Sequence, residues 1–259
     1  MTLHVDTAWL LSTLLLSLRI AAATMLAPVF GPTQIPGQVR VIFAMTLAVL
    51  LVAALPAVAP TSAQAFDSIA GLIGAAAVEL VIGASLSFGF LAAYAATQVA
   101  GRTLDIQMGF GAGAVLNPAT QNMSPVLGTL FGMVAIAAFL GMDGHHVLIK
   151  ALSLSTQSTP PGSLAYAPDW EAFLRQSGVM FTFGLAFAAP VMLGLLLADL
   201  ALAVLARSMP QLNVFVLSFT VKIVLGLTGL AASIRLSESL LAALFGATYN
   251  FWESVAGTR

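Results

Sequence analysis

The sequence predicts an all-α membrane protein with about six long apolar helices, some of them kinked or hairpin-like, and a C-terminal amphipathic helix. Of its 259 residues, 59% are hydrophobic and 7% are charged, and the mean hydropathy is +1.01. Soluble domains carry a charge on roughly a quarter of their residues. The chain is therefore expected to lie in a membrane or in the core of a hydrophobic assembly.

A helix needs about 20 mostly apolar residues to cross a bilayer. Five or six stretches qualify, at about 8–27, 40–59, 69–97, 126–149, 174–206 and 212–234. The fifth is too long for one perpendicular crossing, because a helix rises only about 1.5 Å per residue. We therefore expect it either to kink at Pro190 or to form a helical hairpin.

Residues 235–259 are expected to form a separate amphipathic helix that closes a single domain spanning residues 1–259. Its apolar residues recur at helical spacing, while Ser237, Glu238 and Asn250 fall elsewhere on the wheel. Glycines in the third stretch, among them Gly83 and Gly89, predict close helix packing. The longest polar stretch, about 153–172, contains three prolines and is expected to be a connecting loop.

Composition and motifs favour no catalytic class. The net charge of −1 gives no reason to expect nucleic acid, and the chain has no cysteine. We find no Ser-His-Asp, Walker or nucleotide-binding pattern, so we expect neither an enzyme nor a cofactor. Basic residues are scattered over successive connections and do not determine an orientation in the membrane.

A single Asn-Pro-Ala triplet at residues 117–119 raises the possibility of a water channel. Such a channel needs two broken half-helices in corresponding halves, and the triplet occurs once. The surrounding glycines and polar residues predict a loop over residues 106–125. Core packing is the default explanation for Met108, but a loop that combines glycines with Met108 and Phe110 also has the composition of a mobile closure.

Among the charged residues of the apolar stretches, the candidates for burial within a helix are Arg19, Glu79, Asp199 and Lys222. Each costs roughly 2.5 to 3.5 kcal/mol to insert and therefore needs a partner or a role. We favour interhelical ion pairs over a proton or ion relay.

Asp143, His145 and His146 stand together in the sequence GMDGHHVLIK. Adjacent helical residues point about 100° apart, so the two histidines cannot face one ion without a third element. We therefore expect a polar cluster at a helix end and no metal ligands.

Residues 187–226 read FAAPVMLGLLLADLALAVLARSMPQLNVFVLSFTVKIVLG, and an earlier stretch reads GRTLDIQMGFGAGAVLNPATQNMSPVLG. Both resemble the FliR family, the R subunits of the flagellar type III export gate, and the resemblance covers essentially the whole chain. The positions that carry it in the first stretch are Asp199, Arg207, Pro210, Gln211, Asn213, Phe215 and Lys222.

The resemblance implies a single-copy structural subunit of a hetero-oligomeric export gate in the bacterial inner membrane, within the flagellar basal body. The implied partners are the P, Q and B subunits, membrane lipid and, transiently, unfolded export substrates. Much of the assembly is implied to be lifted out of the bilayer plane toward the periplasm. The buried charges would then pair across subunits.

By the same resemblance, residues 106–125 correspond to the plug that keeps the family's channel closed. The residues assigned to it are Met108, Gly109, Phe110, Gly111, Gly113, Asn117 and Pro118. Phe110 and the neighbouring glycines are expected to seal the channel, and Asn117-Pro118 is expected to shape the turn of the plug. Asp199, Arg207 and Lys222 are assigned to packing within the subunit or against P, Q and B.

Two positions depart from the family pattern. The family usually has Asp-Pro where this chain has Asn117-Pro118, and commonly Gly-Phe-Pro where this chain has Ser218, Phe219 and Thr220. The second departure leaves open the T subunit of virulence type III secretion. The intramembrane charges leave open a secondary transporter of a small solute.

Overall fold

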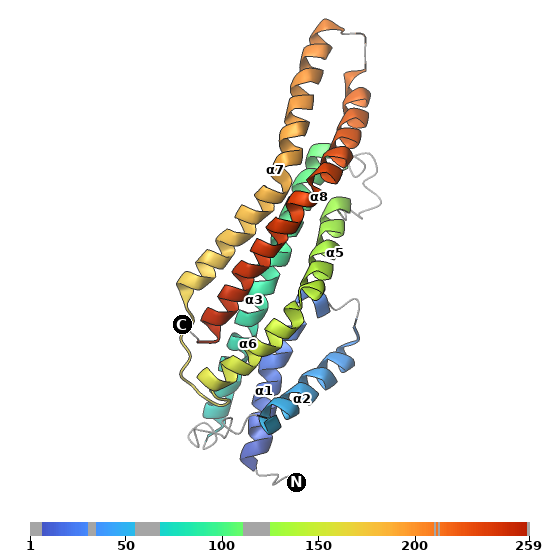
Figure 1. The fold of residues 1–259 in the computed structure, drawn as a ribbon. Coiled ribbons are helices and arrows are strands. Elements are labelled where there is room, and N and C mark those ends of the chain that lie inside the picture. The colour runs from blue at the N-terminus through green and yellow to red at the C-terminus, as the bar shows by residue number, and fades with distance from the viewer. Residues whose placement is uncertain are drawn as a thin grey trace. The chain divides into compact units, whose positions relative to one another are not determined.

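A computed structural model describes residues 7–30, 35–54, 68–110, 125–209, 211 and 213–257. These residues form helices and their connections, with no strand among them (Figure 1), which confirms the predicted all-α fold. The elements are α1 (Thr7–Met25), the 3-10 helix η1 (Pro28–Phe30), α2 (Gly37–Ala54), α3 (Ile69–Met108), α5 (Val126–Gly141), α6 (Gly144–Ser158), α7 (Trp170–Ser208) and α8 (Val214–Val255).

Five segments among the described residues are long and apolar enough to cross a membrane. They are α1, α2, α3, α7 and residues Val216–Arg235 of α8. A sixth, α5 with α6, qualifies only as a broken span. The expectation of five or six membrane spans is thus confirmed.

The stretch predicted over residues 126–149 forms a bent pair of helices, inclined by 67°, and not one continuous helix. The first helix ends at Gly141, and a new helix starts at Gly144 and continues to Ser158. Asp143 between them has a φ of 56°, in the left-handed region that interrupts an α-helix. The connection expected from residue 153 therefore begins only after Ser158.

The hairpin alternative for residues 174–206 is wrong, because α7 continues as one helix through Pro190. A proline removes one backbone hydrogen bond, and the rest of the backbone ladder holds the helix together.

The helix expected to be separate over residues 235–259 is instead the second part of α8, which runs unbroken through Arg235. The serines near this position are accommodated within the helix, because their hydroxyls donate to carbonyls one turn earlier, as Ser237 does to Ser233 at 3.0 Å. The sequence therefore becomes more polar here while the helix continues. The amphipathic pattern itself is confirmed, because Leu244 and Trp252 are buried while Glu238 is exposed.

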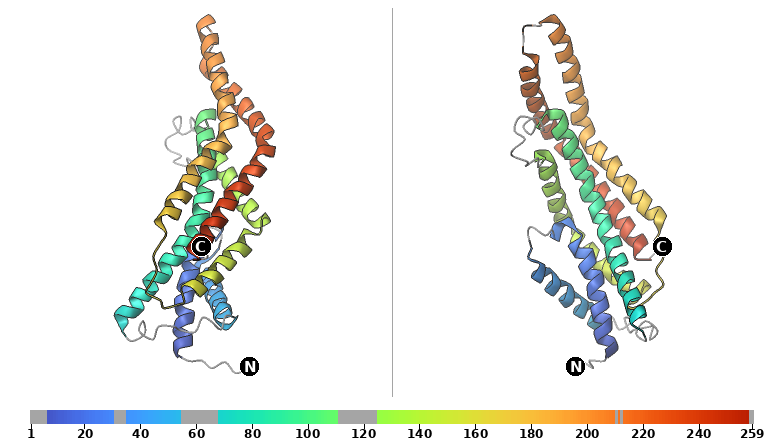
Figure 2. Two further views of the ribbon diagram at one scale, coloured as in Figure 1. Left: turned by 60° about the vertical axis from the view of Figure 1, so that its left-hand side comes forward. Right: turned by 180° about the vertical axis from the view of Figure 1, so that it is seen from behind.

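The chain divides into two compact units, and α3, α5, α7 and α8 each contribute a part to both. Unit 1 comprises residues 1–92, 139–176 and 247–259, and unit 2 comprises residues 93–138 and 177–246. Within unit 1, α1 packs against α2 (Figure 2). Unit 2 contains the segment of α3 that leads to the predicted plug and most of the antiparallel pair α7 and α8.

A buried ion pair lies in unit 1. Arg19 Nε contacts Glu79 Oε2 at 2.6 Å, and both side chains are 0% exposed. The guanidinium also donates to Ser155 Oγ at 3.0 Å and to the Thr159 carbonyl at 2.8 Å, and the Gly162 N–H donates to Glu79 Oε1 at 3.3 Å. One charge pair therefore joins α1, α3, α6 and the connection that follows α6.

Glycines let helices approach closely beside this pair, as predicted. A Cβ at Gly83 would meet the Arg19 carbonyl, and one at Gly89 would lie 2.6 Å from Trp252 Nε1. The Trp252 indole in turn donates to the Leu86 carbonyl at 2.6 Å. The end of α8 is thus held against α3 by a close contact and a hydrogen bond.

Replacing Arg19 with Met is expected to lower the free energy of unfolding by about 3 to 5 kcal/mol, because Glu79 would remain as a buried, uncompensated carboxylate. Unfolding of the detergent-purified protein by denaturant measures the effect. The double variant Arg19→Met/Glu79→Leu should be more stable than Arg19→Met alone, since an apolar pair leaves no buried charge.

The control is Arg175→Ala. Arg175 pairs with Glu171 at 2.8 Å, but their side chains are 69% and 82% exposed, so its removal should change stability by less than about 1 kcal/mol. A double variant no more stable than the single one would contradict the ion-pair account.

Candidate functional site

The described part of the predicted plug segment begins at the end of α3. Met108 is buried, and its side chain occupies the space above Gly226 of α8. Gly109 has a φ of 83°, which favours glycine, and a Cβ there would lie 3.1 Å from the Phe219 ring. The half-buried Phe110 donates its N–H to the Asp105 carbonyl at 3.0 Å. Unit 2 thus fixes the start of this segment.

The remaining residues assigned to the plug lie outside the described residues. They are Gly111, Gly113, Asn117 and Pro118. Their assignment therefore stays a prediction.

Asp105 joins the two ends of this segment. Its side chain is buried, and its two carboxylate oxygens accept the backbone N–H groups of Leu127 at 3.0 Å and Gly128 at 3.1 Å, in the first turn of α5. These N–H groups have no partner within the helix, so the carboxylate caps α5. Its negative charge also interacts favourably with the positive N-terminal end of the helix dipole. A Cβ at Gly101 would meet the backbone of Gly128, so α3 and α5 are in close contact here.

Asp105 was not among the residues predicted from the sequence. A capping residue is normally recognised because it directly precedes its helix. Asp105 lies 22 residues before Leu127, so local spacing carries no sign of the contact.

Asp199 and Lys222 form an ion pair between α7 and α8. Lys222 Nζ lies 2.6 Å from Asp199 Oδ1, with the lysine side chain 22% and the aspartate side chain 46% exposed. The two helices run antiparallel at this level (Figure 1). The pair therefore closes within this chain and needs no residue of another subunit.

The other motif residues lie around the connection between α7 and α8. Arg207 is exposed in the last turn of α7, where its charge complements the helix dipole. Gln211 is exposed, and Asn213 Oδ1 accepts the Val216 N–H at 3.4 Å at the start of α8. Phe215 lies in the first turn of that helix. The remaining motif residue, Pro210, lies outside the described residues.

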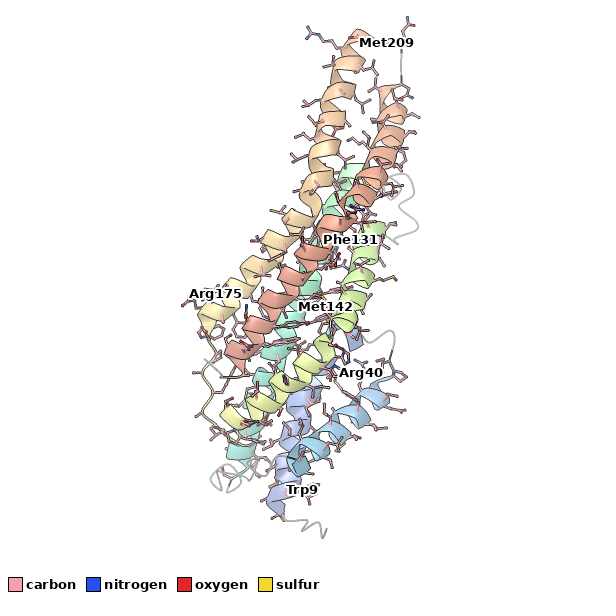
Figure 3. The ribbon with its side chains drawn as sticks, viewed as in Figure 1. Trp9, Arg40, Phe131, Met142, Arg175 and Met209 are labelled. Carbon is pink, nitrogen blue, oxygen red and sulfur yellow. The ribbon has the colours of Figure 1, made fainter. Side chains whose placement is uncertain are left out.

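The polar cluster predicted at a helix end is present at the start of α6. The ligand atoms of Asp143, His145 and His146 all lie within 4.8 Å of one another. Met142, labelled in Figure 3, lies at the break between α5 and α6. The Tyr249 hydroxyl donates to its backbone carbonyl. Burial raises the pKa of Tyr249, and the negative charge of Asp143 raises it further.

Comparisons with known proteins identify the family. The model of the family described as "Bacterial export proteins, family 1" matches residues 10–248. The chain is 30% identical to flagellar biosynthetic protein FliR of Escherichia coli over 90% of this chain and 88% of that protein. It is 32% identical to FliR of Bacillus subtilis over 81% of each chain. Secretion system apparatus protein SsaT of Salmonella typhimurium is 29% identical over 62% of this chain and 63% of its own length. The chain therefore belongs to family 1 of the bacterial export proteins, the family of FliR.

Proposed function

We propose that this chain is the channel-forming R subunit of the flagellar type III protein export gate in the bacterial inner membrane, passing unfolded flagellar subunits. The observation that carries the proposal is the extent of the match to FliR, about nine tenths of both chains for the Escherichia coli protein. The match to SsaT covers less than two thirds of either chain, so flagellar export is favoured over virulence secretion.

Exposed apolar surface supports a place in a hetero-oligomer with P, Q and B subunits. In α2, which has the composition of a membrane span, only Ala44 and Ala48 are buried, while Ile42 is 65% exposed. Only 6% of the residues in the most apolar window of the span within α8 are buried. Lipid or other apolar subunits must cover these surfaces, because water does not solvate them favourably.

The plug role is part of the proposal. The segment after Phe110 starts from a hydrogen-bonded turn, and Asp105 holds its far end at α5. A segment anchored at both ends can move aside for a substrate and return, since its ends stay close together. The ion pair of Asp199 and Lys222 is proposed to keep α7 and α8 together for assembly rather than to relay protons.

Native mass spectrometry tests the proposal. The chain, affinity-tagged, is co-expressed with the membrane-protein genes of its own operon and extracted in detergent. We expect one copy of this chain with several copies of two smaller partners. A lone chain or a homo-oligomer that is stable without partners would contradict the gate and favour a small-solute transporter.

Deleting residues 110–116 is expected to make membranes that contain the complex leaky to small ions without dissociating it, because the seal is removed while the helices remain. Ion flux into vesicles and native mass spectrometry give the two readouts. The control is Leu174→Ala, which truncates a 74% exposed apolar side chain elsewhere. Unchanged permeability in the deletion variant would refute the plug.

A matched pair at Asp105 tests the anchor. Asp105→Ala removes the cap of α5 at a cost of about 1 kcal/mol and should produce a smaller leak than the deletion. Asp105→Asn should leak less than Asp105→Ala, because the asparagine side chain keeps one acceptor oxygen for one of the two N–H groups, while its NH2 group cannot accept the other. Equal leaks in the two variants would show that capping is not the cause.

Replacing Lys222 with Ala is expected to lower the yield of assembled complex, with export falling in proportion, because Asp199 loses its partner. Quantitative pull-down and secretion of flagellar subunits measure the two effects. The exchange Asp199→Lys/Lys222→Asp should recover part of the yield, since the pair is only partly buried. Normal assembly with abolished export would favour an ion relay instead.

A further inference from the structure

The cluster at the start of α6 has the composition of a metal site. Two imidazoles and one carboxylate converge, and His146 Nδ1 lies 3.2 Å from Asp143 Oδ1. The ring centroids of His145 and His146 are 4.1 Å apart and inclined by 38°. Imidazole with carboxylate suits Zn²⁺ and its transition-metal neighbours, whereas Mg²⁺ and Ca²⁺ prefer oxygen ligands alone.

Asp143 supplies the third element that two adjacent histidines need. It lies outside the helix, at the interruption between α5 and α6, and its left-handed backbone conformation ends the first helix. From there its carboxylate reaches the first turn of α6, as its contact with His146 shows. The site therefore combines the turn between the two helices with the first turn of α6.

One ring nitrogen of the cluster lacks a partner. Nδ1 of His145 is buried from water and has no hydrogen-bond partner among the described residues. A buried polar atom without a partner carries the full cost of its desolvation. A bound metal ion would satisfy such a nitrogen, since neutral imidazole coordinates through its free lone pair.

The surroundings predict an accessible site of modest affinity. The side chains of Asp143 and His146 are 73% and 69% exposed, so an ion can reach them and water can complete its coordination. The positive end of the α6 dipole opposes a cation, while the full negative charge of Asp143 favours one. Three protein ligands with an open position differ from the closed, four-ligand sites that hold structural zinc.

We propose that Asp143, His145 and His146 bind one divalent transition-metal ion, with Zn²⁺ the best match. The ion would tie the turn before α6 to the first turn of that helix. This inference does not rest on the export function.

A zinc titration tests it. The full chain is purified in detergent with a tag that contains no histidine, treated with EDTA, freed of chelator and titrated with ZnCl₂ against a chromophoric zinc indicator. We expect one Zn²⁺ per copy of this chain. His146→Gln should weaken binding by at least about tenfold, because loss of even a supporting group outside the coordination shell typically costs that much.

The control is His4→Gln, which removes the third histidine of the chain and should leave binding unchanged. Asp143→Asn keeps the shape of the side chain and should also weaken binding, which guards against misfolding of the histidine variant. Equal zinc uptake by the wild-type protein and the double variant His145→Gln/His146→Gln would overturn the proposal. So would the absence of any uptake.

Discussion

A charged group placed among apolar helices is stable only when it finds partners inside the protein. This constraint explains one central contact in each of the two units. In unit 1, Arg19 and Glu79 satisfy each other and then bind three further groups on α6 and the connection after it. In unit 2, the Asp105 carboxylate satisfies two N–H groups of α5. Each contact joins segments far apart in the sequence, because a membrane supplies no water to substitute for them.

The same constraint connects the fold to the proposed gate. Small residues let helices approach closely within each unit, as Gly83 does beside Arg19 and Gly101 beside Gly128. Outside these contacts, much of the apolar surface stays uncovered, most clearly on α2 and on the span within α8. A chain that pairs Arg19 with Glu79 and Asp199 with Lys222 internally while leaving apolar faces open is suited to assembly with other apolar subunits, and the match to FliR points to the same conclusion.

The residues predicted interhelical ion pairs, which the described structure confirms, whereas the resemblance implied pairing across subunits. Arg19 with Glu79 and Asp199 with Lys222 both close within the chain. Contact with other subunits is therefore expected to rest on apolar surface. At the break between α5 and α6, the ligand atoms of Asp143, His145 and His146 lie within 4.8 Å of one another.

The sequence by itself determined the helical class, the apolar spans, the close packing at glycines and the family, because each depends on local composition, periodicity or ordered motifs. It did not determine the break at Asp143, which depends on one backbone conformation, or the continuity of α8 through Arg235, where polarity changes but the backbone does not. Only the tertiary structure showed the partners of Arg19 and the capping role of Asp105. Those contacts join residues between 22 and 140 positions apart, and no local pattern encodes a distance of that kind.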